Sequence, residues 1–194
     1  MKKTILLAVL FAMFSSSQLL SAQCTTTVSG IEVTIGTWTK EGSPYCVDGH
    51  LLIENLIIEP GVRVEFLGNY VFEVAGVLTA IGTKEDPIVF ARAETNTVGW
   101  QGIYFNNKNR GSKLAYCTIE GSVNSGLRIL NSLPSIENCI ISNNNASQGG
   151  GININLTSLA ASEKLLLIGC TVTDNTSLSH GGGIRRLPYI CRTA

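Results

Sequence analysis

The stretch that decides the fold is CIISNNNASQGGGININ, residues 139–155. A short apolar strand is followed by an asparagine-rich corner, a glycine triplet and a second strand in which apolar and polar residues alternate. The pattern recurs as CTIEGSVNSGLRI at residues 117–129 and as CTVTDNTSLSHGGGI at residues 170–184. The three cysteines that open these stretches are 22 and 31 residues apart, and the extra length of the second interval lies in a predicted loop at residues 155–163. This period, with short strands and no helical periodicity, predicts a β-solenoid.

Upstream of these repeats, alternation with a period of two continues. Val62, Val64 and Phe66 alternate with charged residues, and turn residues separate the segments of this kind. Each such coil buries too few apolar side chains to be stable alone, so the coils must stack and pair their strands. We therefore predict about five to six coils of parallel β-helix over residues 51–184, preceded by an N-terminal cap region at residues 23–50.

The repeat also predicts how the cysteines are used. Cys117, Cys139 and Cys170 occupy one position in successive coils, where they would form an inward ladder of small buried side chains. Stacked strand positions rarely present good disulfide geometry, so free thiols are expected. Cys24 and Cys46 lie near the cap and could pair, but the sequence alone leaves that open. No pair of cysteines has CxxC spacing, which disfavours a zinc site.

Residues 1–22 have the features of a secretory signal peptide: two early lysines, an apolar run at residues 5–14 too short to span a bilayer, and small residues before a cut after Ala22. The alternative is an anchoring N-terminal helix. Lipid attachment at Cys24 is disfavoured because Gln23 stands where a small residue is expected. We therefore expect a secreted or cell-surface protein with no membrane span after removal of the signal.

The charge balance excludes one class of partner. The chain has 14 basic and 14 acidic residues, and without the two signal-peptide lysines 12 basic residues stand against 14 acidic ones. This is not the basic footprint of a nucleic-acid-binding protein. Charged residues make up only 14% of the chain, which is typical of an extracellular β-rich protein that owes its solubility to Asn, Ser, Thr and Gly.

The chain resembles bacterial secreted right-handed parallel β-helix repeat proteins, the pectate-lyase-like superfamily in the broad sense. Its Asn- and Gly-rich repeats are also similar to the passenger repeats of polymorphic outer-membrane proteins. The resemblance covers residues 43–184, and it implies architecture far more strongly than activity, since many functions share this fold. The stretches that carry it, besides the repeats, are SPY at 43–45, LIIEPGVRVEF at 56–66, GVLTAIGT at 76–83, PIVF at 87–90 and GWQGIYF at 99–105.

Residues 185–194 depart from that resemblance, because they contain neither a second strand pattern nor a cap. We interpret this irregular tail as the end of a truncated or frame-shifted product, with an open C-terminal edge that invites self-association. The alternative is a natural short tail, since terminal repeats often deviate.

Catalysis is not apparent. Lyases of the resembled superfamily need clustered carboxylates for calcium and a basic residue to abstract a proton. After the signal peptide there are three aspartates, Asp48, Asp86 and Asp174, and none is followed two residues on by another acid. The two histidines, His50 and His180, are predicted to be solvated turn residues. No catalytic residue, metal ligand or cofactor is therefore predicted.

One surface could bind a ligand. In the strand after each asparagine-rich or glycine-rich corner, the outward residue is in turn Tyr104, Arg128, Asn153 and Arg185, with Trp100 at one end. Parallel stacking would align them on one face, where they could bind an extracellular polysaccharide or cell-surface glycan. The alternative is an ordinary solvated sheet face, with Trp100 packed in a corner.

The sequence therefore favours a non-catalytic secreted or cell-surface β-helix protein, or the N-terminal fragment of one, that acts as a scaffold or as an adhesion or glycan-binding module. The alternative is a polysaccharide lyase or glycoside hydrolase of the same fold whose catalytic coils are missing from this chain.

Overall fold

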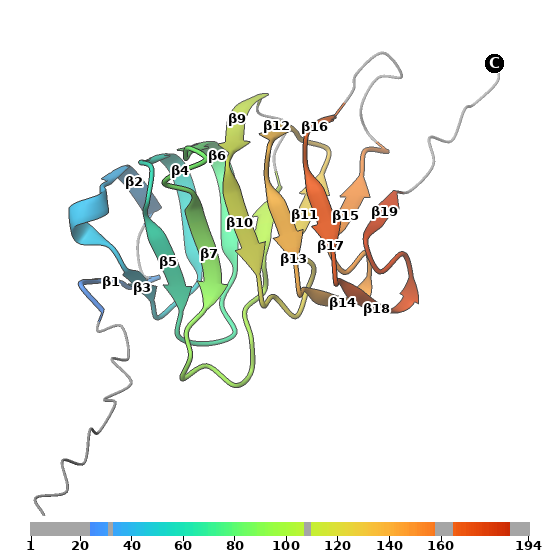
Figure 1. The fold of residues 1–194 in the computed structure, drawn as a ribbon, viewed down its shortest axis with the longest axis horizontal. Helices are drawn as coiled ribbons and strands as arrows, with labels where there is room; N and C mark the ends of the chain where they lie inside the picture. The colour runs from blue at the N-terminus through green and yellow to red at the C-terminus, as the bar shows by residue number, and fades with distance from the viewer. Residues whose placement is uncertain (1–23, 31–32, 107–109, 158–164, 187–194) are drawn as a thin grey trace, which may run out of the picture.

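The computed structural model describes residues 24–30, 33–106, 110–157 and 165–186. These residues form successive coils that stack along one axis, as the ribbon shows (Figure 1). All strand pairing between them is parallel, which is the arrangement that the repeats predict. The first sheet has one strand from each coil, in the order β1 (Thr26–Val28), β3 (Tyr45–Val47), β5 (Arg63–Phe66), β7 (Ile88–Arg92), β10 (Cys117–Glu120), β13 (Ile140–Ser142) and β17 (Thr171–Thr173).

The second sheet divides along its length. Its early coils contribute the long strands β2 (Val33–Trp38), β4 (Leu51–Ile58) and β6 (Phe72–Ile81), and β6 pairs with two shorter strands of the next coil. One branch continues as β8 (Ile103–Phe105), β11 (Leu127–Leu130), β15 (Ile152–Asn155) and β19 (Ile184–Arg186). The other branch continues as β9 (Arg110–Ala115), β12 (Leu133–Glu137) and β16 (Leu166–Ile168). A corner pair, β14 (Asn145–Gln148) with β18 (Thr176–His180), and a short 3-10 helix, η1 (Lys40–Gly42), complete the described elements.

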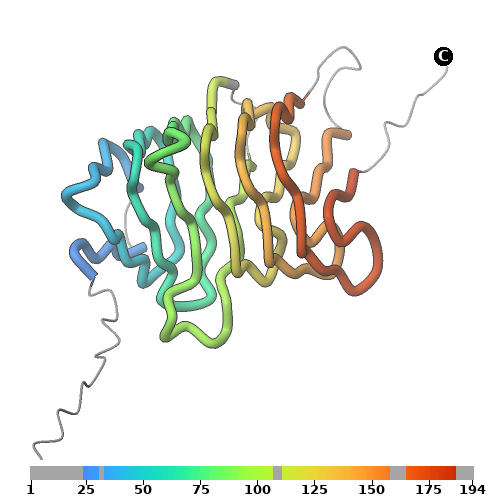
Figure 2. Tube along the Cα trace, in the orientation of Figure 1, coloured from blue at the N-terminus to red at the C-terminus, as the bar shows by residue number. Residues whose placement is uncertain are grey.

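The core lies between the sheets, where inward side chains stack coil upon coil. In the first sheet Val64 pairs with Phe90, Phe90 with Ile119, and Ile119 with Ile141, and all four side chains are buried. The Cα trace shows these turns wound around a continuous interior (Figure 2). The strands are short because each crosses one side of the coil before a turn residue redirects the chain.

Coil length varies while this register is kept. The inward positions that begin at Tyr45 and end at Val172 are separated by 19, 26, 29, 22 and 31 residues. The extra residues lie at the corners between strands, since the strands of the first sheet all keep three to five residues. Corner insertions thus leave the ladder intact.

Paired strands begin earlier than the predicted coil boundary at residue 51, because β1 and β2 already pair with β3 and β4. A register shift between Thr34 and Ile35 interrupts β2, whose Val33 and Ile35 are 49% and 68% exposed. The signal peptide predicted at residues 1–22 lies outside the described residues. So do the greater part of the predicted loop and all but the first two residues of the tail.

The asparagine-rich corners adopt the backbone conformation that their composition predicts. Asn143 and Asp174 have φ angles of 55° and 52°, in the left-handed region that asparagine and aspartate tolerate. The next residue in each corner, Asn144 or Asn175, turns inward: the Asn144 Nδ2 group donates to the carbonyl of Ile119 at 2.9 Å and to Oδ1 of Asn175 at 3.0 Å. The hydrogen bonds of these amides link three successive coils.

The three repeat cysteines are free thiols, as predicted, but only Cys117 and Cys139 are buried, and Cys170 is partly exposed. Each of the three thiols donates to the carbonyl two residues before it, as expected for equivalent rungs. Cys24 and Cys46, whose pairing the sequence left open, form a disulfide with a Cα–Cα distance of 5.6 Å. This bond ties the first described residue to β3.

Candidate binding surfaces

The predicted stripe exists in register. Tyr104 of β8 pairs with Arg128 of β11, Arg128 with Asn153 of β15, and Asn153 with Arg185 of β19. All four side chains are partly exposed. One rung before Tyr104 stands Glu73 of β6, which sequence reasoning did not include. This stripe, defined as residues 104, 128, 153 and 185, runs along the outer face of one branch of the second sheet.

Arg128 is the most constrained member of the stripe. The carbon at the centre of its guanidinium lies 4.3 Å from the centre of the Tyr104 ring, a cation–π arrangement. Its Nε is buried and has no hydrogen-bond partner among the described residues. Burial lowers the pKa of Arg128, and the nearby Tyr104 and Glu73 oppose that shift. The result is a positioned cation with an unused donor.

Arg128 and Arg185 flank a shallow hollow of about 210 Å³. Asn153 lies on the rung between them, and its Nδ2 donates to the carbonyl of Gln148 at 3.2 Å, which fixes the amide. The Tyr104 face that Arg128 covers is unavailable to a ligand. The hollow therefore offers guanidinium and amide groups, with hydrogen bonding rather than ring stacking as its main chemistry.

Trp100 does not extend this stripe, which corrects the prediction of it as a ligand-binding residue. Its side chain is 0% exposed. The ring stacks on Phe66 with 4.0 Å between centroids, and its Nε1 donates to the carbonyl of Glu120 at 2.8 Å. Indole rings at corners bury a large apolar area while their one donor finds a carbonyl, and Trp100 follows that rule.

The two histidines are exposed, as the sequence predicts, but His180 ends strand β18 and is not a turn residue. His50 accepts the backbone N–H of Val71 at 3.2 Å and lies edge-on to Tyr70. No group of three or more His, Cys, Asp or Glu side chains among the described residues has the geometry of a metal site. Within the same part of the chain, no helix is long and apolar enough to cross a membrane.

A second hollow, of about 590 Å³, lies on the outer face of the first sheet, and sequence reasoning missed it. Its floor is Ala91 of β7, which is only 3% exposed and pairs with Glu65 of β5. On the other side of β7, Glu120 follows Ile119, the residue that pairs with Phe90. The side chains of Arg63 and Glu120 line the hollow, from the two coils on either side of β7. We call it the Ala91 groove. The sequence signal was present, because Glu65, Ala91 and Glu120 are all outward positions of first-sheet strands, but only the register shows that they are neighbours.

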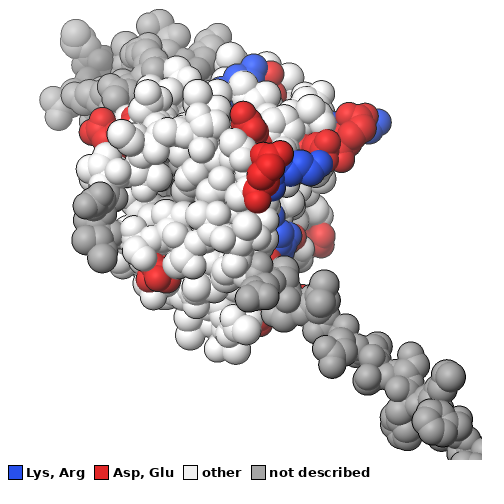
Figure 3. Space-filling view, turned by 90° about the vertical axis from the view of Figure 1, so that its left-hand side faces the viewer, with Lys and Arg blue, Asp and Glu red and all other residues white. Residues whose placement is uncertain are grey.

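Charge is unevenly distributed around this end of the molecule. Seen from the N-terminal end, acidic and basic side chains gather mainly along one side, and much of the remaining surface carries none (Figure 3). One exposed pair on this part of the chain is Lys40 with Asp86, whose charged atoms are 2.7 Å apart. Such exposed pairs contribute little to stability, so the charges matter more for solubility and for ligand contacts.

The coils, the parallel register and the asparagine corners define a right-handed parallel β-helix protein. The family model described as a right handed beta helix region matches residues 53–185. This is more than half of the chain, and the chain belongs to that family. No curated protein and no solved structure matches the chain.

Proposed function

We propose that this chain is a non-catalytic, exported β-helix protein whose stripe binds a glycan that carries acidic groups. The observation that carries the proposal is Arg128, a guanidinium held on the Tyr104 ring with a buried Nε that has no partner among the described residues. A buried donor without an acceptor is costly. The Arg128 guanidinium also lines the hollow of about 210 Å³, so a carboxylate or sulfate bound there would form a charge-assisted hydrogen bond with it.

The stripe also has the shape that a polymer needs. Arg128 and Arg185 stand two rungs apart, about 10 Å at the spacing of parallel strands. Asn153 between them supplies an amide for hydroxyl groups. An extended polysaccharide could therefore contact both cations at once, and the rigid sheet holds the contact groups in place without an ordering cost.

The features of residues 1–22 support the exported location of this proposal. A glycan ligand also fits that location, since exported proteins meet cell-surface and extracellular polysaccharides. The stack also suits a scaffold role, because a stiff rod of coils would hold the stripe at a distance from the surface to which the protein is attached.

The test is binding of the purified protein to immobilised polygalacturonate, dextran and poly-glutamate at 0.15 M salt. We expect polygalacturonate to bind, dextran to bind at least about tenfold more weakly, and Arg128→Gln to weaken polygalacturonate binding about tenfold, the effect of losing one hydrogen bond to a charged group. Lys84→Gln, which removes an exposed cation outside the stripe, is the matched control and should bind as the unmodified protein does. Equal binding by Arg128→Gln and the unmodified protein would reject the stripe. Equal binding of poly-glutamate and polygalacturonate would reject a glycan ligand in favour of general anion binding.

A further inference from the structure

We propose that the Ala91 groove is a second, separate binding site, whose ligand is a short zwitterionic peptide with free ends. The groove is on the first sheet, and the stripe is on the second sheet. Its volume of about 590 Å³ is within the range of small-ligand sites. All of its lining residues are among the described residues.

The wall of the groove is rigidly built. The loop at residues 93–99 folds around Asn96, which is 2% exposed. Its Nδ2 donates to the carbonyls of Phe66, Gly99 and Gly68, and its Oδ1 accepts the backbone N–H groups of Val98 and Gly99. A loop held by one fully used buried amide keeps its shape before any ligand arrives, which lowers the entropic cost of binding.

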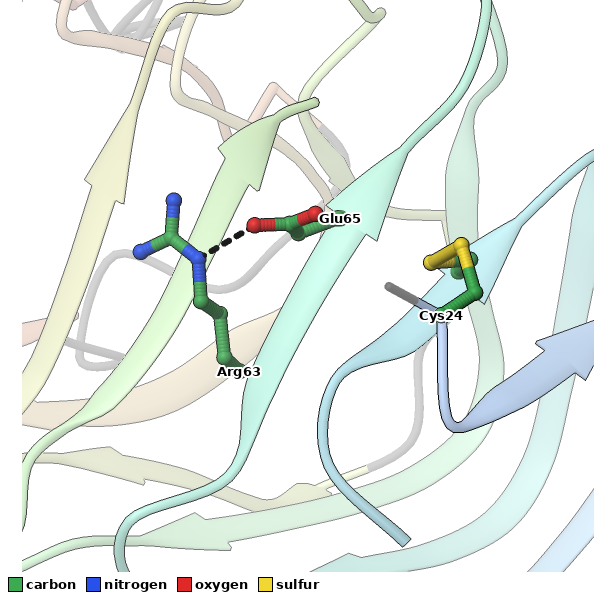
Figure 4. Close-up of a disulfide and its surroundings, with 4 residues drawn as sticks. Cys24, Arg63 and Glu65 are labelled. Atoms are coloured by element: carbon green, nitrogen blue, oxygen red, sulfur yellow. Dashed lines mark hydrogen bonds and ion pairs between the residues drawn. A yellow bond between two sulfur atoms is a disulfide. The ribbon is translucent and has the colours of Figure 1, made fainter. Parts of the chain in front are cut away.

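At the β5 side the groove presents the cation of Arg63. Glu65 is 7% exposed and lies on the rung between the disulfide-bonded Cys46 and Ala91. Its carboxylate accepts the Nε–H of Arg63 at 2.5 Å, and the close-up shows the two terminal nitrogens of that guanidinium turned away from Glu65 (Figure 4). Those two nitrogens have no partner among the described residues, so Glu65 orients Arg63 without using up its donors. Arg92 lines the groove at its other end, where its side chain lies against Gly121 and one Nη donates to the carbonyl of Asn96 at 3.3 Å.

Elsewhere the groove presents anions. Glu94 projects from the loop and Glu120 from β10, and in the described part of the chain neither carboxylate has a hydrogen-bond or ion-pair partner. Gly121, at φ 71°, adopts a backbone conformation that favours glycine, and a Cβ there would lie 3.0 Å from the Cγ of Arg92. The lining thus holds two arginines and two glutamates in equal number, which favours a ligand with both signs of charge over a simple anion or cation.

The remaining lining residues narrow the ligand class. No aromatic side chain lines the groove, so it lacks the stacking platform that sugar rings use. Val98 and Val123 are 59% and 43% exposed and supply an apolar section instead. Arg63 lies two coils from Thr118, and Glu120 is two residues further along β10, so the Cα atoms of Arg63 and Glu120 are about 12 Å apart. An extended chain of three residues spans up to about 11 Å. A tripeptide can therefore place its carboxylate near Arg63 and its ammonium group near Glu120.

The test is isothermal titration of the full chain with trialanine, N-acetyl-trialanine and trialanine amide. We expect free trialanine to bind with a Kd below about 1 mM, and each blocked peptide to bind at least about tenfold more weakly, because each loses hydrogen bonds to a charged group. Glu120→Gln should weaken trialanine about tenfold, and Ala91→Leu should abolish binding by filling the floor. Glu85→Gln, an exposed carboxylate outside the groove, should have no effect.

Three results would overturn the proposal: no binding of trialanine up to about 10 mM, equal binding of the blocked peptides, or full binding by Ala91→Leu with an unchanged circular dichroism spectrum. If Glu120→Gln fails to fold, Glu94→Gln, whose side chain is exposed on the loop, takes its place with the same expected loss. Polygalacturonate binding by Ala91→Leu should be unchanged, so failure of this site and failure of the stripe give different results.

Discussion

Replacement of Asn144 by alanine is the most direct test of what holds the stack together. The Asn144 side chain is 1% exposed. It donates to the carbonyl of Ile119 and to Oδ1 of Asn175, and its Oδ1 accepts the backbone N–H of Ser122 at 3.0 Å. Alanine removes all three bonds and leaves the N–H of Ser122 and the carbonyl of Ile119 buried without these partners.

The expected cost follows mainly from the N–H of Ser122, which loses its acceptor, while the carbonyl of Ile119 lies in β10 between two paired strands. A buried donor left unsatisfied costs about 1–3 kcal/mol and a lost hydrogen bond about 1 kcal/mol, so the free energy of unfolding should fall by about 3 kcal/mol. Oδ1 of Asn175 keeps the backbone N–H of Asn144 as a donor at 3.0 Å and adds little to the cost. For a protein of this size the loss corresponds to a fall in Tm of about 6–12 °C.

The assay is urea unfolding followed by circular dichroism, with the slope of the transition compared between variants. Asn145→Ala is the matched control, because the Asn145 side chain is exposed and makes no hydrogen bond to another described residue. It should change stability by no more than about 0.5 kcal/mol. If Asn144→Ala lowers the free energy of unfolding by less than about 1 kcal/mol, or by no more than the control does, the asparagine corners do not hold the coils together and the prediction is wrong.

Three further outcomes follow from the described contacts. Replacing Cys24 and Cys46 by serine opens a covalent loop with a sequence separation of 22 residues and should lower the free energy of unfolding by about 3 kcal/mol in urea; an unchanged midpoint would contradict it. A thiol reagent added to the folded protein should label Cys170, which is partly exposed, well before Cys117, which is 1% exposed, and mass spectrometry of the digest would expose the reverse order. Hydrogen bonds from Ser135 and Lys113 lower the pKa of Glu137, so its stabilising contribution is present above the unfolded pKa of about 4.3 and is lost as the pH falls through the lower folded value. Glu137→Gln should therefore narrow the difference in Tm between pH 6 and pH 3, and an equal difference in both proteins would refute the assignment.

The fold could be predicted because each residue type that marks the repeat indicates one local structure. A cysteine beside a strand, an asparagine or aspartate at a left-handed corner and a glycine before the next strand recur in the two coils that follow Cys139 and Cys170, and Cys139, Asn143 and Gly149 occupy those places in the structure. The first coil was not predicted, because its strand β2 is interrupted by a register shift between Thr34 and Ile35 at the edge of the stack.

The candidate sites were only partly predictable, for a physical reason. The stripe depends on one outward residue per coil, which the repeat register locates directly, so Tyr104 and Arg128 were found. The Ala91 groove depends on the loop at residues 93–99, whose shape comes from hydrogen bonds of one buried asparagine to scattered backbone groups. No repeating pattern in the sequence indicates those hydrogen bonds. The burial of Trp100, which removed it from the stripe, is likewise set by its stacking on Phe66 in the preceding coil.

The unequal coil lengths also have an engineering consequence. Successive inward positions of the first sheet differ in spacing by up to 12 residues, from 19 to 31, with no loss of strand pairing. We therefore expect a corner to accept an inserted foreign segment without loss of strand pairing, as the natural corners accept their extra residues. Residues 94–95 project from the wall of the Ala91 groove and are exposed, so a reporter peptide inserted between them should be displayed while the rod beneath keeps its shape. The strands thus fix where each corner lies, and the sequence of the corner decides what is displayed there.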